Sequence, residues 1–261
     1  MGEIFAIANQ KGGVGKTTTA INLASALAIK KNRILLVDLD PQGNATSGLG
    51  IEGSRITHTV YDFFISEIPL EELTIPTEIN SLFLLPSNIQ LIGAEVELIN
   101  LPSRESILKG KLENLKEKFD FIFIDCPPSL SILTINALVA AKFALIPVQC
   151  EYYALEGLGR LTDVIEKIQI SFNPDLEIAG VVLTMADLRT NLTREVIRQV
   201  RDYFPRKVYK TVIPRNIRIG ESPSFGKPVI LYAPRSKGSK GYLRLAKEMS
   251  IYAKKSLRQR A

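Results

Sequence analysis

The glycine-rich stretch NQKGGVGKTTT, residues 9–19, constrains this chain more than any other segment. It follows an apolar run of strand length, residues 4–8, and leads into a helix-prone segment, residues 17–30. Three glycines let successive backbone N–H groups turn toward one point, and a helix that begins there adds the positive end of its dipole. The sequence therefore predicts a strand, a phosphate-binding loop and a helix.

Two side chains of the loop suit a magnesium-bound nucleotide. Lys16 supplies the charge that reaches the terminal phosphates, and the hydroxyl of Thr17 is placed to ligate Mg²⁺. The loop departs from the pattern GxxxxGK[ST], because Gln10 holds the first glycine position and a second lysine, Lys11, follows it. An ordinary glycine turn would not account for the strand, the helix and both lysines together.

The segment KGGVGKT resembles the deviant Walker A motif of the ParA/MinD family of ATPases. The resemblance implies ATP and Mg²⁺ as cofactors, and a homodimer that sandwiches two ATP molecules, with Lys11 reaching the partner's nucleotide. It also implies a set of nucleotide-binding residues drawn from the loop and from three later positions: Lys11, Gly12, Gly13, Val14, Gly15, Lys16, Thr17, Thr18, Met185, Pro214 and Asn216.

Two further apolar runs of strand length end in aspartates, residues 33–38 and 119–125. Their lack of alternation is typical of parallel strands buried on both faces, and α/β sheets bind ligands at the carboxyl ends of such strands. By resemblance, Asp40 in the following DLDPQGN segment orients the attacking water and acts with Lys11 and Lys16 in catalysis. The same resemblance assigns the metal site to Thr17, Asp38 and Asp125.

The remaining periodicity predicts further buried strands and helices in alternation. Strands are expected at 82–86, 143–148, 176–184 and 211–216, and helices at 59–64, 69–73, 89–98, 106–119, 131–141, 193–204 and 240–258. This order favours an α/β fold with a doubly wound, mostly parallel sheet and helices on both faces, as in P-loop NTPases. We expect one ParA-type ATPase domain over residues 1–261.

The charge is unevenly distributed. Residues 1–185 hold 14 Lys/Arg and 22 Asp/Glu, a net −8, whereas residues 186–261 hold 19 and 5, a net +14. A third this basic is typical of a protein that binds a polyanion. The resemblance implies non-specific double-stranded DNA, with Arg189 and Arg218 as contacts, and a ParB-like centromere-binding protein as the partner that stimulates hydrolysis.

No long apolar segment predicts a membrane span, since the most apolar window, residues 132–148, is interrupted by polar residues and too short. The N-terminus lacks a secretory signal, so we expect a cytoplasmic protein associated with the nucleoid. Cys126 and Cys150 are interpreted as inert, reduced core thiols, although two cysteines per subunit could hold an iron–sulfur cluster between subunits. His58 stands alone in a polar turn and supports no metal site.

Two alternative functions remain open from the sequence. A membrane-associated division-site ATPase of the MinD type would use the same nucleotide sandwich, but it requires an insertable helix, and the basic tail 254–260 offers only Leu257. A metabolic P-loop enzyme, such as a dethiobiotin synthetase or an iron–sulfur reductase, would require an acceptor pocket or paired cysteines. The division-site alternative gives no reason for the basic last third, and a metabolic enzyme of this kind seldom carries a lysine at the position of Lys11.

Overall fold

The computed structural model describes residues 2–258, with side chains as far as Ser250. Its centre is a seven-stranded sheet in the order β3-β4-β2-β5-β1-β6-β7, in which only β3 runs antiparallel to its neighbour. The strands are β1 (Glu3–Ile7), β2 (Ile34–Asp38), β3 (Ile75–Pro76), β4 (Leu82–Leu85), β5 (Phe121–Asp125), β6 (Phe143–Gln149) and β7 (Glu177–Thr184).

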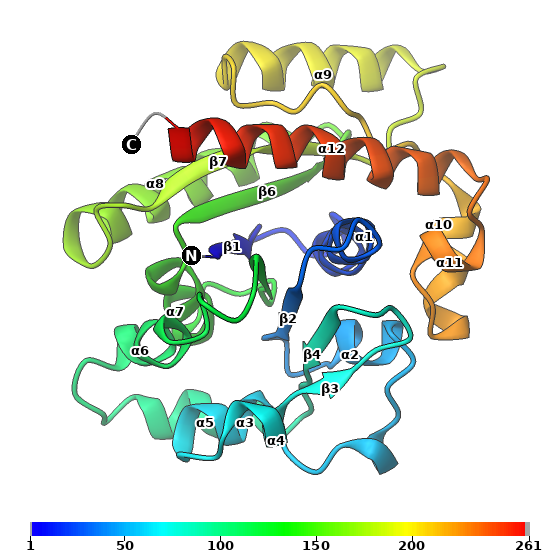
Figure 1. The fold of residues 1–261 in the computed structure, drawn as a ribbon. Coiled ribbons are helices and arrows are strands. Elements are labelled where there is room, and N and C mark those ends of the chain that lie inside the picture. The colour runs from blue at the N-terminus through cyan, green and yellow to red at the C-terminus, as the bar shows by residue number, and fades with distance from the viewer. Residues whose placement is uncertain (1, 259–261) are drawn as a thin grey trace.

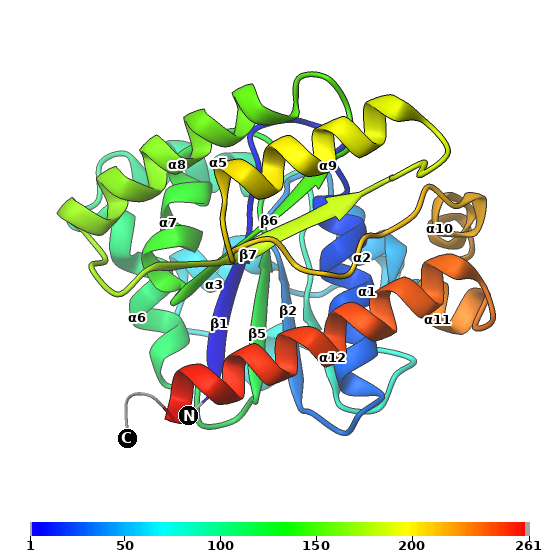
Figure 2. The same cartoon turned by 90° about the horizontal axis from the view of Figure 1, so that it is seen from above.

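Helices cover both faces of this sheet (Figures 1 and 2). One face carries α1 (Lys16–Ala28), α2 (Asn44–Gly48), α10 (Ile217–Glu221), η3 (Ser222–Phe225), α11 (Val229–Tyr232) and α12 (Lys237–Arg258). The other carries α3 (Val60–Ile65), α4 (Leu70–Leu73), α5 (Leu91–Leu98), η2 (Arg104–Ser106), α6 (Ile107–Glu113), α7 (Ile132–Ala140), α8 (Ala154–Ser171) and α9 (Asn191–Tyr203). A short turn, η1 (Gly53–Arg55), precedes α3.

The sheet separates two hydrophobic cores because neighbouring side chains on a strand point to opposite faces. In β1, Ile4 and Ala6 pack with α7 and α8, whereas Phe5 and Ile7 pack with α1 and α12. All four side chains are almost completely buried. Burial on both sides explains why the strands read as continuous apolar runs, and it confirms the predicted doubly wound α/β sheet.

Strand register brings the predicted functional segments to one edge. Ile7, the last residue of β1, pairs with Asp125 of β5, and Asp38 of β2 pairs with Asp125 from the other side. Since all three strands are parallel, the loop after Ile7 and both aspartates meet at the carboxyl edge of the sheet. Residues that are far apart in sequence thus form one site.

The predicted strand at 211–216 is wrong. That segment makes only an isolated bridge between Ala186 and Pro214, and the N–H groups of Lys210 and Thr211 donate to the carboxylate of Glu248 on α12, at 2.6 and 3.0 Å. Pro214 has no backbone N–H and therefore cannot donate a hydrogen bond to a neighbouring strand. Three backbone hydrogen bonds join the segment to the end of β7, from Ile213 N to Leu183 O at 2.8 Å, from Ala186 N to Ile213 O at 3.1 Å and from Arg215 N to Ala186 O at 3.0 Å. They amount to one bridge and not to a strand, and a side chain from α12 holds the start of the segment.

Other boundaries also differ from the predictions. The helix expected over 106–119 ends at Glu113, and the rest of the segment forms turns from which Leu115 and Phe119 still pack into the core. No helix is predicted where α2 lies, and β3 is not predicted because two residues carry no periodicity. Helix α12 begins at Lys237 and buries Leu245 and Met249, whereas the side chain of Tyr252 and those of the basic tail lie outside the described residues.

Among the described helices, none combines the length and the apolar character that crossing a membrane requires.

Candidate nucleotide and nucleic-acid site

The glycine loop is fixed by hydrogen bonds that tie it to two strands, β6 and β7. Gly15 caps the N-terminus of α1 in the left-handed region, at φ 88°, as a residue without a side chain permits. The hydroxyl of Thr184 at the end of β7 donates to Val14 O at 2.8 Å. Asn9 accepts from Lys11 N at 2.9 Å and donates to Pro147 O on β6 at 2.7 Å. The loop is therefore held in shape from both sides.

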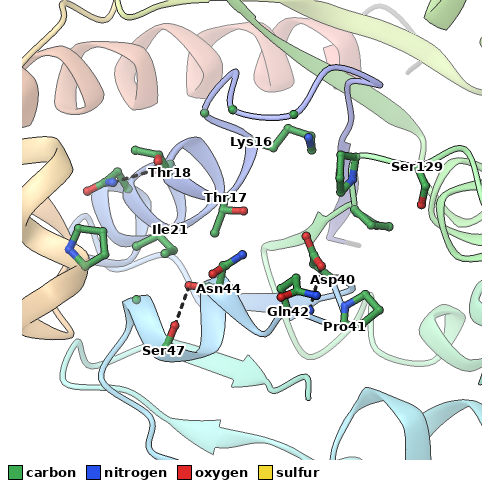
Figure 3. A pocket seen from close by; sticks show the side chains of 18 of the residues that line it. Lys16, Thr17, Thr18, Ile21, Asp40, Pro41, Gln42, Asn44, Ser47 and Ser129 are labelled. Carbon is green, nitrogen blue, oxygen red and sulfur yellow. Dashed lines mark hydrogen bonds between the residues drawn. The ribbon is translucent and has the colours of Figure 1, made fainter. Parts of the chain in front are cut away.

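A cleft of about 640 Å³ opens in front of this loop, between α1, α2 and the segment after β5 (Figure 3). Thr17 points into it, and Lys16 lies at its inner end, where the Nζ atom donates to Lys11 O at 3.3 Å. Burial lowers the pKa of Lys16, although Asp125 and Asp40 oppose that shift. A buried cation with few partners is suited to phosphate oxygens.

Asp125 is fully buried, and neither carboxylate oxygen has a hydrogen-bond partner among the described residues. Burial, followed by the charge of Asp38, raises the pKa of Asp125 well above its usual value. The nearby hydroxyl of Thr17 lowers the pKa of Asp125 in part, but its geometry does not meet that of a hydrogen bond to either carboxylate oxygen. An unpartnered buried carboxylate next to a threonine hydroxyl fits Mg²⁺, which prefers oxygen ligands and retains water.

Asp38 lies beside Asp125, but its carboxylate is engaged within the protein. It accepts from the N–H and the hydroxyl of Thr46 at 2.8 and 2.7 Å, and from Asp40 N at 3.3 Å. Burial raises the pKa of Asp38 to about 6 despite these donors. A direct metal bond would compete with Thr46, so Asp38 here holds the segment 40–46 in place.

Asp40 lines the cleft, as predicted for the residue that orients water. It is buried, and its Oδ1 atom accepts from Gln42 N at 2.9 Å. No hydrogen bond among the described residues uses Oδ2, and Figure 3 shows the side chain directed toward the space below Lys16.

A second cavity of about 290 Å³ adjoins the first and shares Gly15, Thr18, Met185 and Pro223 with it. It brings Met185, Pro214 and Asn216 together, the three later positions of the predicted nucleotide set. Its walls are mostly apolar, and the buried Tyr242 side chain is one of the groups that line it. A flat, partly apolar group joined to phosphates in the first cleft would fit here.

Lys11 does not line the cleft. Its Nζ atom lies 3.5 Å from the carboxylate of Glu151, on the segment between β6 and α8. Exposed pairs at this distance contribute little to stability, so Lys11 is available to a second molecule. Within one chain, the structure therefore leaves Lys11 outside the predicted nucleotide site.

The two predicted DNA contacts lie on neighbouring surface segments at the carboxyl edge of the sheet. Arg189 follows β7 and pairs with Asp187 at 2.7 Å, and Arg218 on α10 pairs with Glu221 at 2.8 Å. Arg194, Arg198 and Arg201 are exposed along one face of α9, as their spacing predicted. The pairing of Arg189 lowers the pKa of Asp187 to about 2. Phosphates would have to displace these acidic partners.

Several residues that line the cleft are not among the predicted site residues. Asn22 donates to Thr18 O and accepts from Val229 N, both at 2.8 Å, which ties α1 to α11. The cleft is also lined by Ile21, Asn44, Ser47, Gly48, Ile92, Glu95, Ser222, Pro223 and Lys227. All but Lys227 come from helices, and nothing in the local pattern of any of these residues distinguishes a cleft-lining position from an ordinary surface or core position.

Both cysteines are free and buried, as expected for core thiols. Burial raises the pKa of Cys126 far above its ordinary value and that of Cys150 to about 11. A buried thiol cannot reach a second subunit, which argues against a shared iron–sulfur cluster. The described residues contain no group of three His, Cys, Asp or Glu side chains that could hold a metal ion.

Comparison with known proteins finds a matching family model and relatives that cover nearly the whole chain. A family model described as an AAA domain matches residues 2–178. The chain is 56% identical to the sporulation initiation inhibitor protein Soj of Bacillus subtilis, over 96% of this chain and 99% of that protein. It is 53% identical to the chromosome partitioning protein ParA of Myxococcus xanthus, over 95% of this chain and 88% of that protein.

Among solved structures, a cobyrinic acid a,c-diamide synthase from Mycobacterium smegmatis, with bound ADP and magnesium, superposes with a TM-score of 0.86. It is 37% identical, over 97% of this chain and 96% of that one.

Proposed function

Because the chain belongs to the Soj/ParA family of chromosome-partitioning proteins, we propose that it is a DNA-partitioning ATPase that hydrolyses ATP slowly and with Mg²⁺. Its ATP-bound homodimer binds DNA without sequence preference, and hydrolysis, stimulated by a ParB-like partner, releases it. The observation that carries the proposal is the cleft lined by the glycine loop, Lys16, Thr17 and Asp40, with the buried, unpartnered carboxylate of Asp125 close to Lys16 and Thr17. The protein would act in the cytoplasm, on the nucleoid, as one ATPase domain over residues 1–261.

The nucleotide would span both cavities. The base would lie between Met185, Pro214 and Asn216, and the phosphates in front of the loop, where residues 12–18 offer N–H groups and Lys16 offers its ammonium. Mg²⁺, held by Thr17 and Asp125, would neutralise developing charge on the phosphate oxygens.

Hydrolysis would depend on positioning more than on covalent chemistry. Asp40 would hold the attacking water through Oδ2, while Asp38 and Thr46 keep the backbone around Asp40 in place. Lys11 would exchange Glu151 for the phosphates bound to a second subunit, and this exchange would link ATP binding to dimerisation.

DNA binding would follow dimerisation, since a dimer doubles the number of cationic contacts. Phosphate contacts carry no sequence information, and Arg189, Arg218 and the α9 arginines are suited to them. The excess of 19 Lys/Arg over 5 Asp/Glu in residues 186–261 supports a polyanion as ligand.

One experiment separates this function from its alternatives. Sedimentation with duplex DNA and with liposomes, each with ATP and with ADP, should show DNA pelleting with ATP only. Liposome pelleting with ATP would favour a division-site role instead. A biosynthetic role of the kind named for the Mycobacterium smegmatis structure would require an organic acceptor, so release of phosphate from ATP in water alone, faster when DNA and a ParB-like protein are added, would count against it.

A further inference from the structure

A hollow of about 380 Å³, here called the β3 hollow, lies beside the edge strand of the sheet. Its lining comes from three segments, residues 49–55 after α2, residues 76–78 at the end of β3 and residues 225–227 between η3 and α11. Figures 1 and 2 show α10 and α11 beside α2 in both views. Sites for small ligands typically enclose about 300 to 1,000 Å³, so this hollow is large enough for one.

Two glycines form part of the lining and bring two of these segments together. Gly50 and Gly226 both lie in the left-handed region, at φ 73° and 61°. A Cβ atom at Gly226 would stand 2.6 Å from the Cα atom of Gly50. The backbones therefore touch where neither residue has a side chain, and the wall of the hollow is fixed there by main chain.

An exposed aromatic ring stands at the hollow. Phe225 is 61% exposed, although its ring stacks on that of Tyr232 with the centroids 4.7 Å apart. The Tyr232 hydroxyl in turn donates to Glu221 Oε2 at 3.2 Å. The Phe225 ring is thus held in place on one side, while much of it stays open to a ligand that has a flat face of its own.

Two cations line the same hollow. The guanidinium of Arg55 forms no ion pair with any described residue. The Nζ atom of Lys227 lies 3.1 Å from the carboxylate of Glu78, and both side chains of this pair are exposed. Exposed pairs contribute little to stability, so a phosphate could take the place of Glu78. Arginine and lysine beside an open ring suit a ligand that is both aromatic and anionic.

The β3 hollow is separate from the nucleotide cleft. Among the residues that line the hollow, only Lys227 also lines that cleft. Lys11, through which we propose dimerisation, follows β1, and β4, β2 and β5 separate β1 from β3 in the sheet. A contact between subunits through Lys11 therefore leaves the hollow open.

We propose that the β3 hollow is a second nucleotide site, which binds a nucleoside phosphate while ATP occupies the cleft. The base would stack on the open part of the Phe225 ring, and the phosphate would pair with Arg55 and Lys227. Glu78, released from Lys227, would accept hydrogen bonds from the ribose hydroxyls. The inference goes beyond the proposed ATPase function and does not rest on it.

Equilibrium dialysis with radiolabelled GMP tests the proposal, after the cleft has been saturated with a non-hydrolysable ATP analogue and Mg²⁺. Ribose 5-phosphate, which has the sugar and the phosphate but no base, is the matched control ligand. We expect GMP to bind while the ATP analogue stays bound, and ribose 5-phosphate to bind about tenfold more weakly, since base stacking is lost. Displacement of the analogue by GMP, or equal binding of the two ligands, would overturn the proposal.

Phe225→Ser should weaken GMP binding about tenfold or more and leave binding of ribose 5-phosphate unchanged. Phe172→Ser is the control, because Phe172 is an exposed phenylalanine at the end of α8, outside the hollow (44% exposed). It should change GMP binding less than about twofold. Arg55→Ala should weaken both ligands, because it removes a phosphate contact. Equal GMP binding by Phe225→Ser and Phe172→Ser would contradict the proposed stacking.

Retention of the ATP analogue in the same dialysis shows that each variant is folded. The assay uses neither DNA nor hydrolysis. If the wild type fails to bind DNA with ATP, the proposed function fails, whereas GMP binding still decides the inference about the β3 hollow.

Discussion

Asp38 and Asp125 are direct neighbours across the sheet, as the paired last residues of β2 and β5, and both are fully buried. Their surroundings differ. Three donors from residues 40–46 satisfy Asp38, whereas Asp125 has no hydrogen-bond partner among the described residues. Because the two carboxylates lie on paired residues of neighbouring strands, the negative charge of Asp38 opposes the ionisation of Asp125 and raises its pKa further. The pair therefore favours a bound cation and destabilises the nucleotide-free protein.

Asp125→Asn should stabilise the nucleotide-free protein at pH 7 by about 1–3 kcal/mol, since a buried unpartnered charge is removed. The same change should weaken binding of the magnesium–nucleotide complex. Urea unfolding measures the first effect, and titration with a fluorescent ATP analogue with and without Mg²⁺ measures the second. A destabilised variant that still binds the nucleotide in a magnesium-dependent way would contradict our assignment.

The stability of the nucleotide-free protein should fall as the pH rises from about 4 through 6, because the folded pKa of Asp38 is about 6 and the unfolded value is about 3.9. Over this interval the folded state binds more protons than the unfolded state, so deprotonation costs stability. Asp38→Asn should flatten that part of the profile. Urea midpoints at half-unit pH steps would test this, and an unchanged slope would argue against the raised pKa.

Asp40→Ala should reduce ATP hydrolysis about 100-fold or more while ATP binding changes little, because Asp40 acts on the water and not on the phosphates. The variant should accumulate as an ATP-bound dimer. Steady-state phosphate release and equilibrium nucleotide binding are the two measurements. Hydrolysis at the wild-type rate would remove Asp40 from the mechanism.

Lys11→Ala should bind ATP with near wild-type affinity and remain monomeric, since Lys11 lies outside its own cleft and its one ion pair among the described residues is with the exposed Glu151. Light scattering with ATP and Mg²⁺, with hydrolysis blocked by Asp40→Ala, measures the dimer. Lys30→Ala, at an exposed lysine beyond the end of α1, is the control and should dimerise. A monomeric Asp40→Ala parent would disprove the sandwich.

Arg189→Ala and Arg218→Ala should each weaken DNA binding, and each variant should do so to the same extent for duplexes of unrelated sequence. Each should also lower the slope of log affinity against log salt by about 0.9 per lost phosphate contact, hence by about twice that in a dimer. Asp187→Asn should strengthen binding, because it releases Arg189 from its ion pair. Arg160→Ala on α8 removes an exposed, ion-paired arginine outside the basic third and serves as control. Fluorescence anisotropy over a salt series measures all four, and a preference for one duplex would contradict non-specific binding.

Local pattern was sufficient for much of the fold. Continuous apolar runs predicted β1, β2, β5, β6 and β7, because each strand is buried on both faces and has no polar alternation to obscure it. The glycine loop, Lys16 and Thr17 were identified because phosphate binding requires backbone N–H groups and one cation close together in sequence. Family resemblance, and not pattern, pointed to Met185, Pro214 and Asn216, which the fold brings to one cavity.

The segment 211–216 shows where local reasoning ends. Its residues have the composition of a strand, but whether an N–H group joins a ladder depends on what lies opposite. The N–H of Thr211 faces Glu248 of α12, and only those of Ile213 and Arg215 reach carbonyls at the end of β7, so a single bridge forms. The difference between Asp38 and Asp125 is likewise invisible in the sequence, since it arises from the donors that Thr46 and Asp40 supply.

By itself, the sequence determined the alternation of buried strands and helices, the phosphate-binding loop and the basic last third, because each depends on residues that are close along the chain. Only the tertiary structure decided which carboxylate is left unpartnered, that Lys11 lies outside its own cleft, and that Arg55, Phe225 and Lys227 line one hollow beside β3. Hydrogen-bond satisfaction and exposure are set by neighbours distant in sequence, so they exist only once the sheet has assembled.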